Sequence, residues 1–409
     1  MRLPTGWAAG AVGGVLQAIA LALPGSALAA PLQLVALALL AAGVMGAAPR
    51  LAALRAGLHA TVATVGTVWW LHISMHVYGG LPAWLSVLAV LALSAFLGSW
   101  CAVTMGLQAW LLRPRDAATV APWRLAPGFV AAWLAYELAR AQWFTGFPWG
   151  MSGYAHVDGL LALAAPWLGV YGMGALAAAL AATLVLQLRS CLSWRRAGLV
   201  LAGLAASALP LATVDFTTPA GRIDVTLLQG NVAQDDKFDP ARIPDSLAWH
   251  ARSLLDAQGD LVVAPETALP LLPEDLPAGM LEGLAARFGT GRTRALIGVP
   301  LGDPVAGFSN SAIGLGGSPA AGAATLNGLS VPVYRYDKHH LVPFGEFIPW
   351  GFRWFVDLMN MPLGDFSRGR LDAAPFEVAG LRLAPNICYE DLFGEELAVR
   401  FRDSSQAPH

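Results

Sequence analysis

Three residues in the C-terminal half of the chain have the side chains that acyl transfer through a thioester requires. Glu266 follows the run "LVVAP", Lys338 follows "YRYD" and Cys388 follows "APNI". A thiol needs a base to become a thiolate, and a positive group must stand where the oxyanion develops. The sequence therefore suggests Glu266 as base, Lys338 as electrostatic partner and Cys388 as nucleophile, with a helix after Cys388 that lowers the pKa of the thiol.

Each of these residues also has a simpler interpretation. A cysteine at the end of a strand is commonly a small buried hydrophobe, and a surface glutamate or lysine is commonly just solvated. The segment "KHHLVPFGEFIP" favours a site, because it gathers Lys338, two histidines and Glu346 around a Pro-Phe-Gly turn. His339 and His340 are adjacent, so on an extended segment they point in opposite directions and make a poor metal pair.

The segments around these residues predict an α/β domain. Short β-branched and apolar runs end at Gly, Pro or Asp, as strands do. We expect strands within residues 222–232, 260–267, 294–300, 309–316, 331–338 and 381–390. Residues 244–258 and 280–289 have helical apolar spacing. Strands that alternate with helices indicate a layered α/β architecture, with the reactive residues at strand ends.

The first half of the chain has the composition of a membrane domain. Of all 409 residues, 56% are hydrophobic and 13% are charged, against roughly 25% charged residues in soluble domains. A bilayer core is crossed by about 20 apolar residues. We expect seven spans, at about 6–23, 32–48, 57–77, 82–112, 123–143, 160–188 and 197–214.

The distribution of arginine predicts the orientation of these spans. With a cytoplasmic N-terminus, the inner loops hold nearly all of the loop arginines, and residues after 214 lie outside. These inner arginines are Arg2, Arg50, Arg55, Arg113, Arg115, Arg124, Arg189, Arg195 and Arg196. The first 30 residues also resemble a cleavable signal peptide. Cleavage leaves the predicted topology unchanged, and both alternatives stay open.

Two pairs of polar residues interrupt the apolar spans. Glu137 and Arg140 are spaced i, i+3, so on a helix they share one face and can neutralise each other. Such a pair either pins its helix as a structural ion pair or organises the entrance to a site. His72 and His76 are spaced i, i+4 and could grip a metal, but no second pair is visible in another span. We therefore predict no metal.

Charge and cysteine content exclude other classes of protein. A net charge of -2 without a basic tract argues against a nucleic-acid partner, because binding phosphates requires clustered Lys and Arg. The three cysteines form neither a disulfide framework nor a CxxC zinc pattern.

Several motifs together resemble one family, the apolipoprotein N-acyltransferases, which join a membrane bundle to a nitrilase-superfamily domain. The resemblance covers nearly the whole chain. The motifs are "TGFPWG" and "GYAHVDG" within 145–159, "LLQGNVAQ" at 227–234, "APETALP" at 264–270, "YDKHHLVPFGEFIP" at 336–349, "FSRG" at 366–369 and "ICYE" at 387–390. The lysine and cysteine motifs, in this order behind seven spans, are highly specific.

The resemblance implies a nitrilase-type triad of Glu266, Lys338 and Cys388. In this family Glu266 would take the thiol proton and later return it. Lys338 would hold the oxyanion together with the backbone N–H of Tyr389. Glu346 matches a second acid that orients the triad.

The resemblance also implies supporting residues and a reaction. Tyr389 and Glu390 match positions that the family needs beside its nucleophile, and Phe238 stands where the family commonly has tryptophan. The implied reaction is ping-pong and needs no cofactor. Cys388 takes a fatty acyl chain from a membrane phospholipid, and the amine of the diacylglyceryl-cysteine of an apolipoprotein then receives it. The implied protein is a multi-pass protein of the bacterial inner membrane. Its oligomeric state stays open, with a monomer as the expectation.

The resemblance predicts two domains, the second of them incomplete. Residues 1–216 form the transmembrane bundle, and residues 222–409 form an α-β-β-α nitrilase-like domain in the periplasm. Family members continue with further strands and a last span, which "FRDSSQAPH" does not supply. A sandwich cut in this way has unpaired edges, so two interpretations of the 409 residues alone stay open: an inactive fragment and a functional acyltransferase. Two alternatives remain: a membrane-tethered amide hydrolase, and a non-catalytic membrane protein whose Cys388 only packs.

Overall fold

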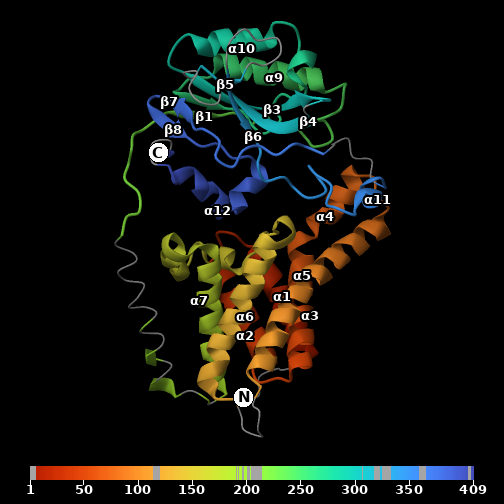
Figure 1. The fold of residues 1–409 in the computed structure, drawn as a ribbon, viewed down its shortest axis with the longest axis vertical. Helices are drawn as coiled ribbons and strands as arrows, with labels where there is room; N and C mark the ends of the chain where they lie inside the picture. Colours follow the sequence, from red (N-terminus) through yellow and green to blue (C-terminus); the bar gives the residue numbers. More distant parts are fainter. Residues whose placement is uncertain are drawn as a thin grey trace. The chain divides into compact units, whose positions relative to one another are not determined.

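The chain forms two compact units, Met1–Thr217 and Thr218–His409 (Figure 1). The computed structural model describes residues 6–113, 120–189, 191, 193–195, 198–199, 203, 214–305, 307–316, 323–324, 333–358, 365–403 and 407–409. The predicted break between residues 216 and 222 lies at this division. Each unit has its own hydrophobic core and is described separately.

The first unit is helical. Its long helices are α1 (Trp7–Leu21), α2 (Ala29–Val44), α3 (Pro49–Val68), α5 (Ala83–Leu111), α6 (Pro122–Gln142) and α7 (Ala165–Leu188). Short helical segments are α4 (Trp70–Ile73), the π-helix η1 (Ser74–Tyr78) and the 3₁₀ turns η2 (Trp143–Thr145), η3 (Ser152–His156) and η4 (Leu160–Ala164). Each of the first six predicted apolar stretches overlaps one long helix, although α2, α3 and α6 begin before the predicted start. The seventh, 197–214, lies almost wholly outside the described residues.

Within the described residues, three helical segments are long and apolar enough to cross a membrane. They are Pro49–Val68, Ala83–Leu111 and Leu160–Leu188. Helices α1 and α2 are apolar but shorter, with 15 and 16 residues. The first unit is therefore a membrane domain, and seven spans remain a prediction.

Small residues let these helices approach closely. A Cβ at Gly14 of α1 would lie 2.5 Å from the carbonyl oxygen of His59 on α3. A Cβ at Gly98 of α5 would lie 2.2 Å from the Thr61 hydroxyl oxygen, also on α3. Close backbone approach is how membrane helices gain packing contacts where lipid removes the hydrophobic driving force.

The second unit is built on a mixed sheet. Among the described residues, six strands pair in the order β1-β2-β3-β4-β6-β5. The strands are β1 (Val225–Leu227), β2 (Leu261–Val263), β3 (Arg294–Asp303), β4 (Gly307–Leu315), β5 (Ala323–Ala324) and β6 (Val333–Asp337). Strands β1, β2 and β3 run parallel, whereas the β3-β4, β4-β6 and β6-β5 pairs are antiparallel. A hairpin of β7 (Phe376–Val378) and β8 (Leu381–Leu383) forms a separate two-stranded sheet.

Alternating side chains place different layers on the two faces of the large sheet. Helices α9 (Ile243–Asp256) and α10 (Met280–Gly289) cover one face, where Leu254 and Phe288 share a buried cluster with Ile297. On the other face, Phe376 of the hairpin clusters with Leu261. These layers are an α/β domain. Shorter segments are η5 (Pro273–Asp275), α11 (Arg353–Val356), η6 (Cys388–Leu392), α12 (Gly394–Leu397) and η7 (Ala398–Phe401).

Most predicted elements of this unit are confirmed. Each of the six expected strand segments overlaps a strand, with β3 and β4 extending beyond the expected bounds, and both expected helices form. Strands β5 and β7 were not predicted. The expectation that Cys388 ends a strand is wrong, because β8 stops at Leu383 and an irregular segment leads to the cysteine.

Candidate active site

Lys338 lies at the centre of a buried polar cluster. It follows β6, and its main-chain N–H donates to the carbonyl oxygen of Asn310 on β4 at 2.8 Å. Its side chain is 1% exposed, with Nζ 2.9 Å from Glu346 Oε1 and 3.6 Å from Glu266 Oε1. Burial alone would lower the pKa of Lys338, but the Glu346 and Glu266 carboxylates outweigh burial and raise the pKa. The lysine is therefore held as a cation.

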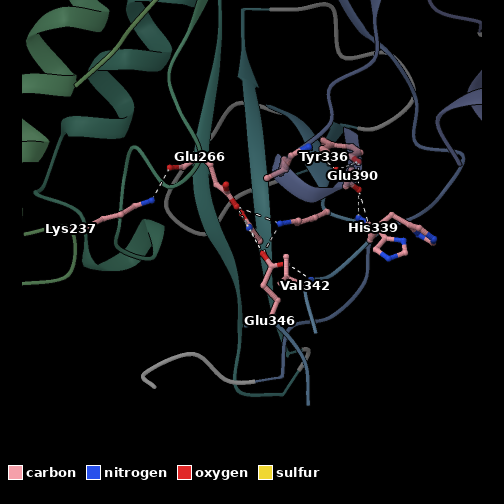
Figure 2. A network of polar contacts seen from close by, with 11 residues as sticks. Lys237, Glu266, Tyr336, His339, Val342, Glu346 and Glu390 are labelled. Atoms are coloured by element: carbon pink, nitrogen blue, oxygen red, sulfur yellow. Dashed lines mark hydrogen bonds and ion pairs between the residues drawn. The ribbon is translucent and has the colours of Figure 1, made fainter. Parts of the chain in front are cut away.

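Asn310 joins the two carboxylates and was not found from the sequence. Its Nδ2 donates to Glu266 Oε1 at 2.6 Å and to Glu346 Oε1 at 2.7 Å. Figure 2 shows Glu266 and Glu346 converging on these shared partners. The available signal was a run of three polar residues, Ser309, Asn310 and Ser311, at the start of an expected strand, a local mismatch that often marks a functional position. We call Glu266, Asn310, Lys338 and Glu346 the lysine network.

Glu346 is presented by a tight turn. Its N–H donates to the Val342 carbonyl at 2.9 Å, and its Oε2 accepts the Val342 N–H at 2.8 Å. Phe344 within the turn has a φ of 64°, which non-glycine residues adopt only at a cost. The predicted grouping of Lys338 and Glu346 around this turn is confirmed by their contact.

Glu266 lies on a closely packed turn that follows β2. A Cβ on Gly298 of β3 would lie 2.4 Å from the Pro265 carbonyl oxygen, so only glycine fits there. Thr267 has a φ of 54°. The Glu266 side chain is 33% exposed, and its main-chain carbonyl accepts a hydrogen bond from Lys237 Nζ at 3.2 Å. The carboxylate therefore reaches Lys338 while remaining partly open to other groups.

Cys388 has the strained backbone and exposed position expected of a reactive residue. Its φ is 53°, and the residue as a whole is exposed. Neighbouring atoms still desolvate the thiol, and burial and the Glu266 carboxylate raise the pKa of Cys388. The Lys338 ammonium and the N–H of Tyr389 act in the opposite direction. The expected lowering is wrong, because only a five-residue 3₁₀ turn follows, which gives a weak dipole, while burial disfavours the thiolate.

Glu390 fixes the turn that carries Cys388. Its carboxylate accepts N–H groups from Ile387 and from His339, both at 2.7 Å, and the Tyr336 hydroxyl at 2.7 Å (Figure 2). Arg400, which the sequence did not single out, donates to the Tyr336 hydroxyl at 2.6 Å and to the Pro385 carbonyl. We call Tyr336, His339, Ile387 and Glu390 the cysteine-turn network. It joins the cysteine segment to the residue that follows Lys338.

The two aromatic residues expected near the nucleophile differ in burial. Tyr389 is buried, with its ring 5.0 Å from that of Phe393 and 5.5 Å from that of His340. Phe238 is 40% exposed, and the Lys237 ammonium lies 5.9 Å from its ring centroid. Tyr389 therefore packs the cysteine turn, whereas the Phe238 ring is open to solvent.

In the first unit, Glu137 and Arg140 are both buried but turn to different partners. Glu137 Oε1 accepts the Ser152 N–H at 2.7 Å. Arg140 donates to the Tyr136 hydroxyl and to the Phe147 carbonyl, both at 3.1 Å. None of the ion pairs between described residues joins Glu137 to Arg140. The predicted direct ion pair does not form, because a backbone N–H after α6 holds Glu137, while the Tyr136 hydroxyl and a backbone carbonyl hold Arg140.

His72 and His76 stack with their ring centroids 5.4 Å apart. His72 Nδ1 lies 2.7 Å from the Ser86 hydroxyl oxygen, and His76 Nδ1 lies 2.7 Å from the Leu81 carbonyl oxygen. Over the described part of the chain, no three His, Cys, Asp or Glu side chains gather as a metal site would require.

Comparison with known proteins identifies relatives along nearly the whole chain. Residues 13–183 match the model of the apolipoprotein N-acyltransferase N-terminal domain. The apolipoprotein N-acyltransferase of Verminephrobacter eiseniae is 48% identical over 424 residues, which cover 97% of this chain and 74% of that protein. Enzymes of the same name from Ralstonia nicotianae and Bordetella bronchiseptica are 47% and 41% identical, covering 83% and 91% of this chain and 62% and 72% of their own lengths.

Proposed function

This chain belongs to the apolipoprotein N-acyltransferase family, and we propose that it transfers a fatty acyl chain from a membrane phospholipid to the N-terminal amine of apolipoproteins through a thioester on Cys388. The observation that carries this proposal is the lysine network. A buried ammonium lies between two carboxylates and lowers the pKa of the Cys388 thiol against the effect of burial. This charge arrangement suits a reaction that passes through a thiolate and an oxyanion.

In the first half-reaction, Glu266 takes the thiol proton as the Cys388 sulfur attacks the ester carbonyl of the phospholipid. The Lys338 ammonium and the Tyr389 N–H stabilise the negative oxygen of the tetrahedral intermediate. The carbon–oxygen bond to the glycerol then breaks, and Glu266 returns the proton to the departing hydroxyl. The products are an acyl thioester and a lysophospholipid.

In the second half-reaction, the free amine of the diacylglyceryl-cysteine attacks the thioester carbonyl. Glu266 accepts a proton from the amine, the same oxyanion contacts act again, and the carbon–sulfur bond breaks. Cys388 recovers its proton from Glu266, and the apolipoprotein leaves with an amide bond. In the proposal, Glu346 and Asn310 orient Lys338 and Glu266 throughout.

The protein is membrane-embedded, and we propose the inner membrane with the second unit in the periplasm. The arginines of the predicted inner loops support this orientation. We further propose that the second unit is a nitrilase-type sandwich, supported by the hairpin that packs against the large sheet, and that the protein acts as a monomer.

A product assay tests this function. Membranes from cells that produce the protein are incubated with a phospholipid labelled in its acyl chains and a synthetic diacylglyceryl lipopeptide that has a free amine. We expect label in an amide of the lipopeptide, and none when the same lipopeptide carries an acetylated amine. Release of the label only as free fatty acid would identify a hydrolase and overturn the proposal.

A further inference from the structure

Lys237 is a second lysine at the site to which the proposed mechanism gives no role. It lies in the turn between β1 and α9, where its N–H donates to the Ala233 carbonyl at 3.1 Å. Its Nζ donates to the Glu266 carbonyl at 3.2 Å. Figure 2 shows the side chain reaching Glu266 from the side away from Glu390 and His339. Lys237 and Lys338 therefore contact the same glutamate, one at its main chain and one at its carboxylate.

The sequence itself makes Lys237 unusual. The chain holds 25 Lys and Arg residues, and Lys237 and Lys338 are the only lysines among them. Arginine serves at every other cationic position, although it cannot replace a lysine where a compact point charge is needed. Both lysines thus occur where a single ammonium meets Glu266, which indicates a local requirement rather than a general surface charge.

The Glu266 turn requires support on the side where Lys237 lies. Thr267 follows with a φ of 54°, which is strained for a β-branched residue. Gly298 packs against the same turn, with no room for a Cβ beside Pro265 and Glu266. The ammonium of Lys237 holds the carbonyl between these two constraints, so its removal would release the backbone of the proposed base.

The charges of the site also call for a second cation. Glu266 and Glu346 carry two negative charges against the single positive charge of Lys338. Transfer of the thiol proton to Glu266 moves one of these negative charges to Cys388 and leaves the excess of negative charge in place. Burial lowers the pKa of Lys237, while the Glu266 carboxylate and the Cys388 thiolate oppose that effect. Electrostatic coupling is mutual, so a positive Lys237 favours ionisation of Cys388.

Other charged groups surround Lys237, and its own turn also carries Asp235, Asp236 and Asp239. Burial lowers the pKa of His250 on α9, and the charge of Lys237 lowers it further. Asp236, in the same turn, lies 3.9 Å from Arg242. The charges of Glu266, Lys338 and Glu346 all act on the pKa of the Cys388 thiol.

We propose that Lys237 is a positioning residue of the active site, which fixes the Glu266 turn through its carbonyl oxygen and stabilises the Cys388 thiolate by its charge. The proposal rests on the proposed role of Cys388 as nucleophile. It extends that role by giving the thiolate two cations, one buried and one partly buried.

Alkylation of Cys388 as a function of pH tests whether the charge of Lys237 stabilises the Cys388 thiolate. The protein carries Cys191→Ser, which removes the other exposed thiol, and iodoacetamide labelling of the Cys388 peptide is followed by mass spectrometry. The midpoint of this alkylation profile is the pH at which labelling reaches half of its maximum rate. In K237M we expect the midpoint to move to higher pH and labelling at pH 7 to fall about tenfold, the effect of one pKa unit. K237R should keep the midpoint of the parent, and so should R242M, which removes an exposed cation of the same segment.

An unchanged midpoint in K237M, or an equal loss of labelling at every pH in K237M and K237R, would overturn the proposal. The kinetics of acyl transfer test whether Lys237 positions the Glu266 turn. K237R should lower kcat with little change in KM, because a guanidinium cannot place one donor as the ammonium does. If the midpoint shifts in K237M while no acyl group is transferred by the parent protein, the proposed function fails and the role of Lys237 stands.

Discussion

The lysine network and the cysteine-turn network are neighbours built around buried glutamates with different partners. In the first, Glu346 meets the Lys338 ammonium and the Asn310 amide. In the second, Glu390 meets uncharged donors, which are backbone N–H groups and the Tyr336 hydroxyl. The lysine network determines the charge around the Cys388 thiol, and the cysteine-turn network fixes the position of the strained turn that carries Cys388. Changes in the first should alter the titration of Cys388, whereas changes in the second should alter stability and geometry alone.

The largest effect is expected for Lys338→Met. The change removes the cation that lowers the pKa of Cys388 and leaves Glu266 and Glu346 without their ammonium. We expect acyl transfer to fall roughly 10² to 10³-fold, as when one oxyanion donor is lost. The alkylation midpoint of Cys388 should also move to higher pH. A variant that retains more than a tenth of the parent rate would contradict the role of Lys338.

Glu346→Gln should affect stability and titration together. Loss of one partner from a buried ion pair costs about 3 to 5 kcal/mol, which thermal unfolding would report. Because the Glu346 carboxylate raises the pKa of Cys388, its removal should move the alkylation midpoint to lower pH. A midpoint that moves upward would show that Glu346 acts on the thiol in another way.

Glu390→Gln should destabilise the protein without changing the titration of Cys388. The amide retains one oxygen, but its NH₂ group faces the donors of Ile387, His339 and Tyr336, so the cost is about 1 to 3 kcal/mol. The alkylation midpoint should stay where it is in the parent. A shift as large as that of Glu346→Gln would erase the distinction between the two networks.

The smallest effect concerns Glu396, which accepts a hydrogen bond from His340 at 3.0 Å. Burial would raise the pKa of Glu396, but this bond and the nearby positive charges lower it below 4.5. A folded pKa below the unfolded one stabilises the protein above the unfolded pKa, and this stability is lost as pH falls through the folded pKa. Glu396→Gln should therefore lose about 1 kcal/mol or less at pH 7, and this loss should vanish once the pH has fallen below the folded pKa of Glu396. Replacement of the exposed Glu395 by Gln should change stability at neither pH.

The sequence located the strands because β-branched runs bounded by Gly, Pro and Asp are local signals. It also identified Glu266, Lys338 and Glu346, which the fold brings into contact. It missed Asn310 and Arg400, because their contacts cross 36 and 64 residues of chain and no local pattern records them. The direction of the pKa of Cys388 was wrong for a related reason, since burial depends on tertiary packing.

In the membrane unit, too, local sequence patterns predicted the helices but not the contacts of individual side chains. Apolar length predicted its helices, but the spacing of Glu137 and Arg140 did not predict their partners. The Ser152 N–H and the Phe147 carbonyl lie in the segment after α6, whose path returns toward the helix, and the Tyr136 hydroxyl lies one turn away on α6 itself. Spacing along a helix shows which side chains can meet, and the competing backbone donors and acceptors decide which of them do.

Capture of the acyl intermediate tests the central claim most directly. Membranes that contain the protein are incubated with phospholipid and no acceptor, the reaction is stopped with acid, and the peptide that holds Cys388 is analysed by mass. We predict a mass increase of one acyl chain that neutral hydroxylamine removes and that Cys388→Ala abolishes, while Cys191→Ala retains it. An acyl group on another residue, or acyl transfer by Cys388→Ala at the parent rate, would contradict the account.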